Sequence, residues 1–402
     1  MIGEMMQGKA FADVRVLDLT QSLGYASKLF ADLGADVTLV EPPGGIAARR
    51  QGPFLGKRRD ENASLHFQYL SAGKRSVVVD LTDERDRAML RELLRNTDIV
   101  IDDRLQSTRK TEGFSYEQVS ALNPEIVWCS VTPFGQSGPR AQDAGDDMVA
   151  MAAGGMAWLT GYADRGPLVV EGDLAVYSSA QYAAVMSMIA YLGREATGGG
   201  QFIDISMQEV VALGTETAPQ FLTLKGVERR RLGEDERQAG IGVYPCKDGY
   251  VLLYAADSGL GTGWSDVVAW LRESGVPDAD SLSAPEWFDN AFKARPDSKA
   301  TFRTIFTAFA ATRGKQDLFE QGQARHIAIA PINDSREAFN DAHLNACGFF
   351  TRIGVIDGTE LKGPGAPYHL SETPWAAGFR APRLGEQTEA IRKALVADEA
   401  MA

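Results

Sequence analysis

The sequence predicts an α/β protein built around a doubly wound parallel sheet, and three observations lead to this prediction. Over residues 1–130, short apolar runs alternate with segments of helical spacing. Buried strands separated by helices form parallel sheets that are covered on both faces. The chain has 402 residues, more than one hydrophobic core usually holds, so a second, smaller domain is expected. The middle of the chain carries a hairpin-like pattern that suits such a domain.

Each element is predicted from its own pattern. Strands are expected where apolar residues run together, and helices where apolar residues recur at helical spacing. The last predicted helix is long, rich in Ala and Ser, and closed by three glycines. The predicted strands are 14–19, 37–41, 76–81, 98–101, 126–131 and 202–205, and the predicted helices are 24–34, 83–96, 116–122 and 175–193.

The domain boundaries are predicted from a change of character near Gly226. A charged, glycine-bounded connector follows, and then two apolar runs over 243–254 with Asp248-Gly249 between them, which is a hairpin signal. Residues 1–226 are therefore predicted as the first part of the large domain and 227–335 as a smaller inserted α+β domain. Residues 336–402, with many turns and a final helix, are predicted to return to the large domain.

Composition narrows the class of protein. A net charge of −13 argues against nucleic acid as the main partner, because phosphate backbones need basic surfaces. No stretch of 18 apolar residues and no signal peptide is seen, and three scattered cysteines fit a reducing environment, so a cytoplasmic protein is expected. The four histidines show no metal-binding spacing, so no metal is expected. The turn after the first predicted strand, Thr20 to Gly24, lacks the G-x-G-x-x-G motif of dinucleotide-binding folds. This argues against a dehydrogenase.

Two segments are candidates for ligand binding. Thr132 to Pro139 directly follows the fifth predicted strand, where a doubly wound sheet places its ligand loops, and its Gly and Pro residues indicate a fixed backbone. The second segment is a basic cluster in an acidic protein, which is either a phosphate site or a solvated surface. This cluster consists of Arg49, Arg50, Lys57, Arg58 and Arg59.

Asp173 is the candidate catalytic residue, and it has two interpretations. It stands between Gly172 and the predicted long helix, where a carboxylate can cap the helix by accepting backbone N–H groups, for about 1 kcal/mol. Aspartate is also ionised at neutral pH and can attack an acyl group without a base to activate it. The residue pattern alone favours the cap and leaves the nucleophile open.

An ordered set of motifs decides between them, because together they resemble the class III coenzyme A transferase family, which includes formyl-CoA and crotonobetainyl-CoA transferases. The resemblance covers nearly the whole chain. The motifs are V-R-V-L-D-L-T at 14–20, L-G-A-D-V at 33–37, E-P-P-G-G at 41–45, G-K-R-S-V at 73–77, N-P at 123–124, the loop at 132–139, G-G-M-A-W-L-T-G at 154–161, G-D at 172–173, T-G-G-G-Q at 197–201, S-E-T-P at 371–374 and A-P-R-L-G-E-Q-T at 381–388.

The resemblance implies a Rossmann-like large domain from both chain ends and two subunits interlocked into a dimer. It implies that Asp173 attacks the thioester of an acyl-CoA, with a free carboxylic acid as the second substrate and no permanently bound cofactor. A homodimer is expected, and a heteromer with a paralogous subunit stays open. The CoA-binding residues that the resemblance implies are Ser22, Leu23, Val79, Asp103, Arg104, Thr132, Phe134 and Gly135.

Some positions depart from the family pattern. Pro42, Thr111 and Thr132 stand where formyl-CoA transferases have cations, so Arg104, Arg109 or the Arg49/Arg50 pair is needed to hold the phosphates.

Two alternatives to the transferase remain. In the related 2-methylacyl-CoA racemases a histidine stands in a G-H-D motif, and here the triplet is Gly145-Asp146-Asp147 without an imidazole. A non-catalytic subunit of a heteromeric transferase is the other alternative.

Overall fold

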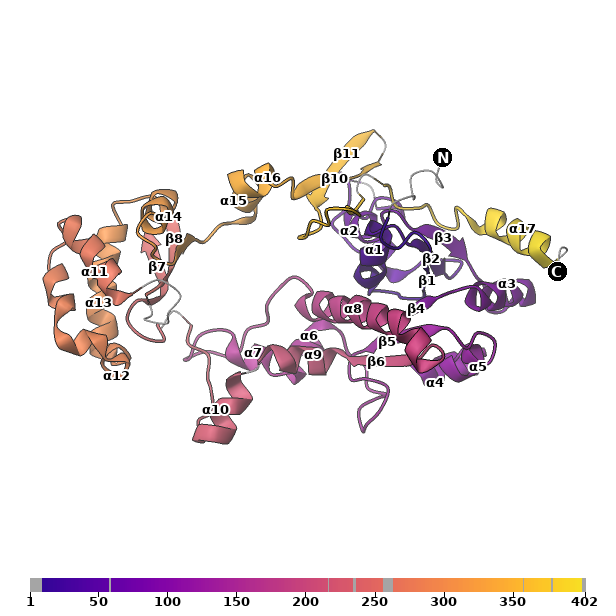
Figure 1. Ribbon diagram of the computed structural model, residues 1–402, viewed down its shortest axis with the longest axis horizontal. Helices are drawn as coiled ribbons and strands as arrows, with labels where there is room; N and C mark the ends of the chain where they lie inside the picture. Colours follow the sequence, from indigo (N-terminus) through magenta and orange to yellow (C-terminus); the bar gives the residue numbers. More distant parts are fainter. Residues whose placement is uncertain are drawn as a thin grey trace. The chain divides into compact units, whose positions relative to one another are not determined.

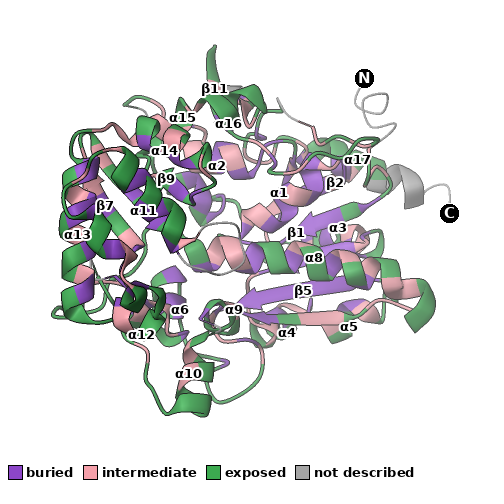
Figure 2. Cartoon of the chain, turned by 60° about the vertical axis from the view of Figure 1, so that its left-hand side comes forward, coloured by how far each residue is buried: buried purple, intermediate pink, exposed green. Residues whose placement is uncertain are grey.

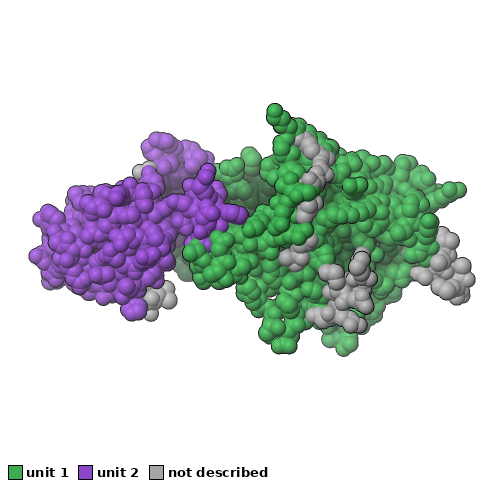
Figure 3. Space-filling model, turned by 90° about the horizontal axis from the view of Figure 1, so that it is seen from above, with its two compact units in different colours: residues 1–157, 169–228, 342–402 green, residues 158–168, 229–341 purple. Residues whose placement is uncertain are grey.

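The fold is described from a computed structural model (Figure 1). The structure describes residues 9–57, 59–215, 217–233, 236–255, 263–356, 358–376 and 379–399. The chain forms two compact units, coloured separately in Figure 3. Unit 1 consists of residues 1–157, 169–228 and 342–402, and unit 2 of residues 158–168 and 229–341.

Unit 1 is built on a six-stranded sheet in which every pair of neighbouring strands is parallel. The strand order is β3-β2-β1-β4-β5-β6, the order of a doubly wound fold whose winding reverses between β1 and β4. The prediction of a doubly wound parallel sheet is confirmed. The strands are β1 (Arg15–Asp18), β2 (Asp36–Glu41), β3 (Arg75–Val78), β4 (Ile99–Asp102), β5 (Val127–Thr132) and β6 (Phe202–Ser206).

Successive strand residues point to opposite faces, so the sheet has two cores. On one face Val16, Ile99 and Val127 pack with residues of α1 (Gly24–Asp32) and α8 (Leu174–Thr197). On the other face, Leu17 and Val100 pack with residues of α3 (Glu84–Arg95), α5 (Tyr116–Ser120) and α17 (Thr388–Glu399). β4 and β5 are accordingly buried along their whole length, as the purple colour of β5 in Figure 2 shows.

The glycines after α8 end the helix and admit the next strand. Gly198 takes the left-handed conformation at the C-cap, with φ of 78°, and its N–H donates to the Arg194 carbonyl at 2.8 Å. A Cβ on Gly200 would lie only 2.0 Å from the carbonyl oxygen of Ile126. The glycine run is therefore needed for close packing where β6 joins the sheet.

The C-terminal segment is held by the edge strand β3. The backbone N–H of Ser76 donates to Gln387 Oε1 at 2.7 Å, and that of Val78 donates to Thr388 Oγ1 at 2.9 Å.

The remaining elements lie in unit 1, except that α7 continues across the boundary with unit 2. They are η1 (Ala47–Arg50), α2 (Leu65–Leu70), α4 (Gln106–Glu112), α6 (Asp147–Ala153), α7 (Met156–Leu159), α9 (Met207–Gly214), α10 (Thr217–Lys225), α16 (Ala342–Ala346), β10 (Phe350–Ile356) and β11 (Thr359–Pro364).

Unit 2 contains the predicted hairpin. β7 (Ile241–Cys246) and β8 (Gly249–Tyr254) pair antiparallel, and β9 (Ile329–Pro331) extends the sheet. Its core is aromatic, with Trp264 stacked on Trp287 at 5.2 Å between ring centroids. The helices of this unit are α11 (Trp264–Glu273), η2 (Ala279–Ser283), η3 (Pro285–Phe288), α12 (Asn290–Lys293), α13 (Pro296–Ala310), α14 (Lys315–Gln323) and α15 (Ser335–Phe339).

Candidate active site

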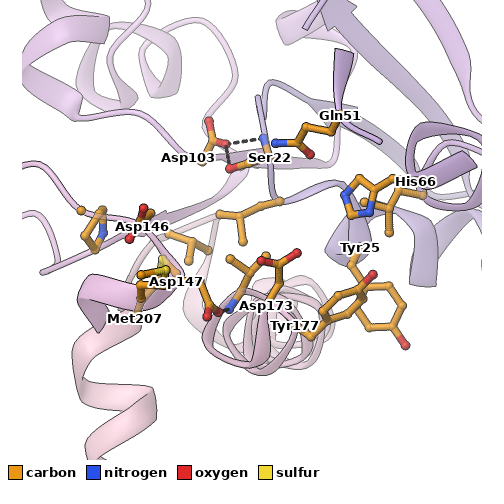
Figure 4. Close-up of a pocket in the computed structure, with 17 residues that line it drawn as sticks. Ser22, Tyr25, Gln51, His66, Asp103, Asp146, Asp147, Asp173, Tyr177 and Met207 are labelled. Atoms are coloured by element: carbon orange, nitrogen blue, oxygen red, sulfur yellow. Dashed lines mark hydrogen bonds between the residues drawn. The ribbon is translucent and has the colours of Figure 1, made fainter. Parts of the chain in front are cut away.

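A pocket of about 370 Å³ opens in unit 1 where β1, β4 and β5 end and α8 begins (Figure 4). This is the edge of the sheet where doubly wound folds bind ligands. The loop after β1 contributes Ser22 and Leu23, β4 is followed by Asp103, and α8 contributes Asp173 and Tyr177. The winding therefore brings together three of the predicted CoA-binding residues and the candidate nucleophile.

Asp173 stands in a strained backbone conformation at the start of α8. Its φ of 54° and ψ of 42° lie in the left-handed region, which costs a non-glycine residue of order 1–3 kcal/mol and is typical of functional sites. The residue is exposed, and Figure 4 shows its carboxylate directed into the pocket. Among the described residues none donates a hydrogen bond to this carboxylate, which leaves it available to a ligand.

The hypothesis that Asp173 caps the helix is wrong, because a different carboxylate does so. Asp147 Oδ1 accepts the backbone N–H of Ala175 at 2.7 Å and that of Val176 at 3.1 Å, while the Asp173 side chain makes no cap hydrogen bond. Asp146, its neighbour, caps α6 by accepting the N–H of Val149 at 3.0 Å. The aspartates of the Gly145-Asp146-Asp147 triplet therefore hold two helix starts, which explains their place without a proton-abstracting role.

Asp103 holds the loop that follows β1. Its Oδ2 accepts the backbone N–H groups of Gln21 and Ser22 at 2.8 and 2.9 Å, and the Ser22 hydroxyl at 3.1 Å. No described group hydrogen-bonds to Oδ1, which is buried. Burial, with a smaller contribution from the charge of Asp102, raises the pKa of Asp103 to about 6. The loop and the strand end at the reversal point of the sheet are thus joined by a carboxyl group that titrates near neutrality.

This raised pKa predicts a pH dependence of stability. Between the ordinary pKa of 3.8 and the folded value of about 6, the folded protein holds more protons at Asp103 than the unfolded chain does. Raising the pH through this range therefore lowers the free energy of unfolding. An Asp103→Asn variant has no carboxyl group at this position, so its free energy of unfolding should not show this decline. The free energy of unfolding of the variant minus that of the native protein should therefore increase from pH 4 to pH 7. Urea unfolding at several pH values measures this, and a pH-independent difference would contradict it.

A second cavity, of about 290 Å³, lies at the ends of β1, β2 and β3. Two more of the predicted CoA-binding residues, Val79 and Arg104, line this second cavity. Glu112 forms an ion pair with Arg104, whose side chain keeps 32% of its exposure. The two cavities flank the β1–β4 reversal, because Gln21 lines one and Ser22 the other.

The predicted loop after β5 is only partly at the pocket. Val131 and Pro133 line it, whereas Thr132 is 2% exposed and, with Phe134 and Gly135, does not line either cavity. Gln136 N–H donates to Asp204 Oδ2 at 2.9 Å, so the loop is fixed to β6. A side chain on Gly135, whose φ is 80°, would meet the Asp204 carboxylate.

Two of the arginines considered for phosphate binding have structural partners. Arg49 is fully buried, with Nε and Nη2 each 2.6 Å from the Glu41 carboxylate. Arg109 is also buried and donates to both oxygens of Asp102, at 2.9 and 2.6 Å. The idea that Arg49 belongs to an exposed phosphate-binding cluster is therefore wrong. Arg50 is exposed and bonds to the Gly44 carbonyl, and Arg58 lies outside the described residues.

The sequence did not point to the aromatic side of the pocket. His66 from α2 and Tyr25 from α1 line it beside Tyr177. Burial lowers the pKa of His66 although the charge of Asp173 acts to raise it, and this favours the neutral imidazole. The spacing of these residues along the chain carries no signal, because three separate elements supply them.

Two further observations concern cofactors and membranes. Among the described residues no group of three or more His, Cys, Asp or Glu could hold a metal ion. None of the described helices is long and apolar enough to span a membrane.

Comparisons with known proteins show the family of the chain. The profile of CoA-transferase family III matches residues 11–388. The chain is 36% identical, over 96% of its length and 94% of the relative, to the succinyl-CoA:(R)-benzylsuccinate CoA-transferase subunit BbsE of Thauera aromatica. It is 29% identical to a succinate–glutarate CoA-transferase of Agrobacterium fabrum, over 93% and 92% of the two chains.

A solved structure gives the same fold. A CaiB/BaiF family protein from Brucella suis superposes with a TM-score of 0.83 at 25% identity, covering 97% of this chain and 100% of that one. The family profile spans most of the chain, and the fold and the sequence relatives point to the same group. The chain therefore belongs to CoA-transferase family III and is a class III CoA-transferase, an enzyme that moves CoA between acids.

Proposed function

We propose that this enzyme moves CoA from an acyl-CoA thioester to a free carboxylic acid through covalent intermediates on Asp173. One observation carries the proposal. The Asp173 carboxylate stands in the pocket with no described hydrogen-bond partner, while Asp147 takes over the capping of α8. An ionised carboxylate at a pocket, with no hydrogen-bond partner, is available to act as a nucleophile, and backbone strain of this kind is found at functional sites.

In the first half of the reaction, an Asp173 oxygen attacks the thioester carbonyl carbon. The C–S bond breaks, CoA leaves as a thiolate, and an acyl–aspartyl anhydride remains. The thiolate attacks the aspartyl carbonyl of this anhydride, which releases the first acid as a carboxylate and leaves CoA on Asp173 as a thioester. Such division of one difficult exchange into easier steps is the advantage of covalent catalysis.

The second half reverses these steps with the other acid. Its carboxylate attacks the aspartyl thioester, which forms a second anhydride and frees the thiolate again. The thiolate attacks the acyl carbonyl of the new acid, giving the acyl-CoA product and the free Asp173 carboxylate. No proton is gained or lost over the cycle, so the scheme needs no residue to act as a general base.

We place CoA along the two cavities. The thioester would lie beside Asp173, and the chain would pass Ser22, Leu23 and Asp103 toward Val79 and Arg104, where the phosphates bind. Cations near phosphates supply charge-assisted hydrogen bonds, and Arg104 is the partly exposed arginine of the second cavity. CoA would not touch Thr132, Phe134 or Gly135 in this arrangement. These residues would instead hold the loop that carries Pro133.

Arg104 is expected to hold phosphate rather than Arg50. An Arg104→Gln variant should bind CoA about fivefold more weakly, because a partly exposed ion pair contributes about 1 kcal/mol, and its affinity should depend less on salt. Arg50→Gln is the matched control, since Arg50 is also an arginine but lines a different cavity, with Lys57 and Arg59. Calorimetric titration with CoA measures both. The assignment fails if Arg50→Gln weakens binding and Arg104→Gln does not.

A stripe of apolar side chains on α8 supports the proposal of an interlocked dimer. Tyr182, Val185, Ile189 and Leu192 follow one face of the helix, and the last three are 54, 58 and 71% exposed. Exposed apolar patches of this kind mark interfaces. The relatives include a protein named as a subunit, so a paralogous chain is a second partner to test.

The dimer proposal predicts the effect of a charge within this stripe. Sedimentation should show the native protein as a dimer and Ile189→Glu as a monomer, because a carboxylate would be buried without a partner. Leu122→Glu, at an exposed leucine outside α8, is the control and should stay dimeric. A native protein that is monomeric at micromolar concentration would exclude the homodimer, and a dimer that forms only with a paralogous chain would indicate the heteromer.

The proposed activity is tested by crossing acyl-CoA donors with carboxylic acids and identifying products by mass. Succinyl-CoA is the first donor to try, because the name of a relative includes it. New acyl-CoA should appear only when both substrates are present. Hydrolysis alone, or no exchange with any pair, would argue against the transferase mechanism.

We also propose a cytoplasmic location, on the grounds of the three unpaired cysteines.

A further inference from the structure

The pocket beside Asp173 has an aromatic wall. Tyr25 and Tyr177 contact each other edge to face, with 4.8 Å between ring centroids and 63° between ring planes. Both line the pocket with His66 and all three are half-buried, so part of each ring is open to a ligand. Figure 4 shows these three side chains on the side of the pocket toward which the Asp173 carboxylate points.

Tyr25 is fixed in place, because it packs against the cluster of buried apolar residues that includes Leu23 and Ala26. Its ring in turn supports the ring of Tyr177 through their edge-to-face contact. Rings anchored in this way lose little freedom when a ligand binds, which favours recognition by aromatic contact.

The rest of the pocket offers an acyl group no ion pair. Neither lysine nor arginine occurs among the described residues that line it. Asp103, Asp146 and Asp147 each accept backbone N–H groups with one carboxylate oxygen. Apolar side chains such as Leu70, Val131 and Val176 complete the lining. Beside polar side chains such as Gln51 and His66, ring faces and apolar side chains are therefore what the described lining offers to the group bound to Asp173.

We propose that at least one of the two acids exchanged by this enzyme carries an aromatic ring, which lies against Tyr25 and Tyr177 while its carbonyl carbon is joined to Asp173. This inference rests on the proposed function, since it takes Asp173 as the atom that holds the acyl group. Ring pairs in offset or edge-to-face contact are more favourable than aliphatic contacts of equal area. Tyr25 and Tyr177 then determine specificity, and they take no part in the bond changes.

The test compares kcat/KM for three acceptor acids with one acyl-CoA donor: 3-phenylpropionate, 3-cyclohexylpropionate and propionate. The first two differ in aromaticity and little in size. The native enzyme should prefer the phenyl acid over the cyclohexyl acid by about three- to tenfold. Tyr177→Leu should remove this preference, mainly by raising KM for the phenyl acid, and Tyr177→Phe should keep it because the ring remains. Tyr25→Leu and Tyr25→Phe repeat the comparison, in case one position does not tolerate leucine.

The outcomes separate this inference from the proposed function. Equal kcat/KM for the phenyl and cyclohexyl acids in the native enzyme, or a preference that survives both leucine variants, would overturn the aromatic wall and leave the transferase intact. Transfer restricted to small aliphatic acids would do the same. Transfer by Asp173→Asn at the native rate would instead overturn the proposed function, whatever the preference among acids.

Discussion

Replacing Asp173 by asparagine should reduce CoA transfer at least about a thousandfold, because the amide is a far poorer nucleophile than the carboxylate. Folding should be nearly unaffected. Asp173 makes no cap hydrogen bond, and asparagine tolerates its left-handed backbone conformation well. Rates with one donor and acceptor pair, together with unfolding curves, measure both effects. Glu171→Gln, two residues earlier and also exposed, is the control and should transfer CoA at close to the native rate.

Trapping provides an independent check on the same residue. Native enzyme incubated with its acyl-CoA should carry a covalent adduct that hydroxylamine converts at Asp173, and a peptide map should locate it there. Full activity of Asp173→Asn, with reversion by deamidation excluded by mass, would refute the assignment. Asp146 or Asp147 would then be the next candidates.

Replacing Arg49 by methionine should lower the free energy of unfolding by about 3–5 kcal/mol, because it leaves the buried carboxylate of Glu41 without its partner. Both side chains are 0% exposed. Arg49 also donates to the Pro382 carbonyl and lies 3.9 Å from the centroid of the Phe67 ring. Its loss therefore weakens the contact between the N-terminal and C-terminal parts of unit 1.

The neighbouring arginine provides the control for this prediction. Arg50→Met should change stability by no more than about 0.5 kcal/mol, since Arg50 is exposed. A double variant that also replaces Glu41 by leucine should recover much of the loss, because a buried ion pair is often replaced by apolar groups without net cost. Chemical unfolding measures all three variants. If Arg49→Met is as stable as the native protein but binds CoA weakly, Arg49 is a phosphate ligand after all.

The parallel sheet was predictable because each of its strands can be recognised from its own residues. Residues 126–131 are apolar except for Ser130, a pattern typical of a strand buried on both faces, and β5 lies at 127–132. The long helix was predicted from 175 to 193, within the observed 174–197. Short elements such as α2 and α9 were missed, because so few residues give too little periodicity to identify a helix.

The side chains that line the candidate site were predicted unevenly. The family motifs identified Asp173 and the strand-end residues of the pocket, but not His66, Tyr25 and Tyr177 as one wall. Arg49 was misjudged because its sequence neighbours are exposed cations. Only the turn of η1 brings its guanidinium onto Glu41, away from solvent.

The sequence by itself determined the order of strands and helices, the class of the fold and the position of the candidate nucleophile, because each of these depends on local periodicity or on a short motif. The tertiary structure alone decided what each polar side chain does. Asp147 caps α8 from 28 positions earlier in the chain than the N–H it accepts, and this leaves the Asp173 carboxylate without a capping role. Such roles depend on distances between residues far apart in sequence, and only the packing of helices on the sheet sets those distances.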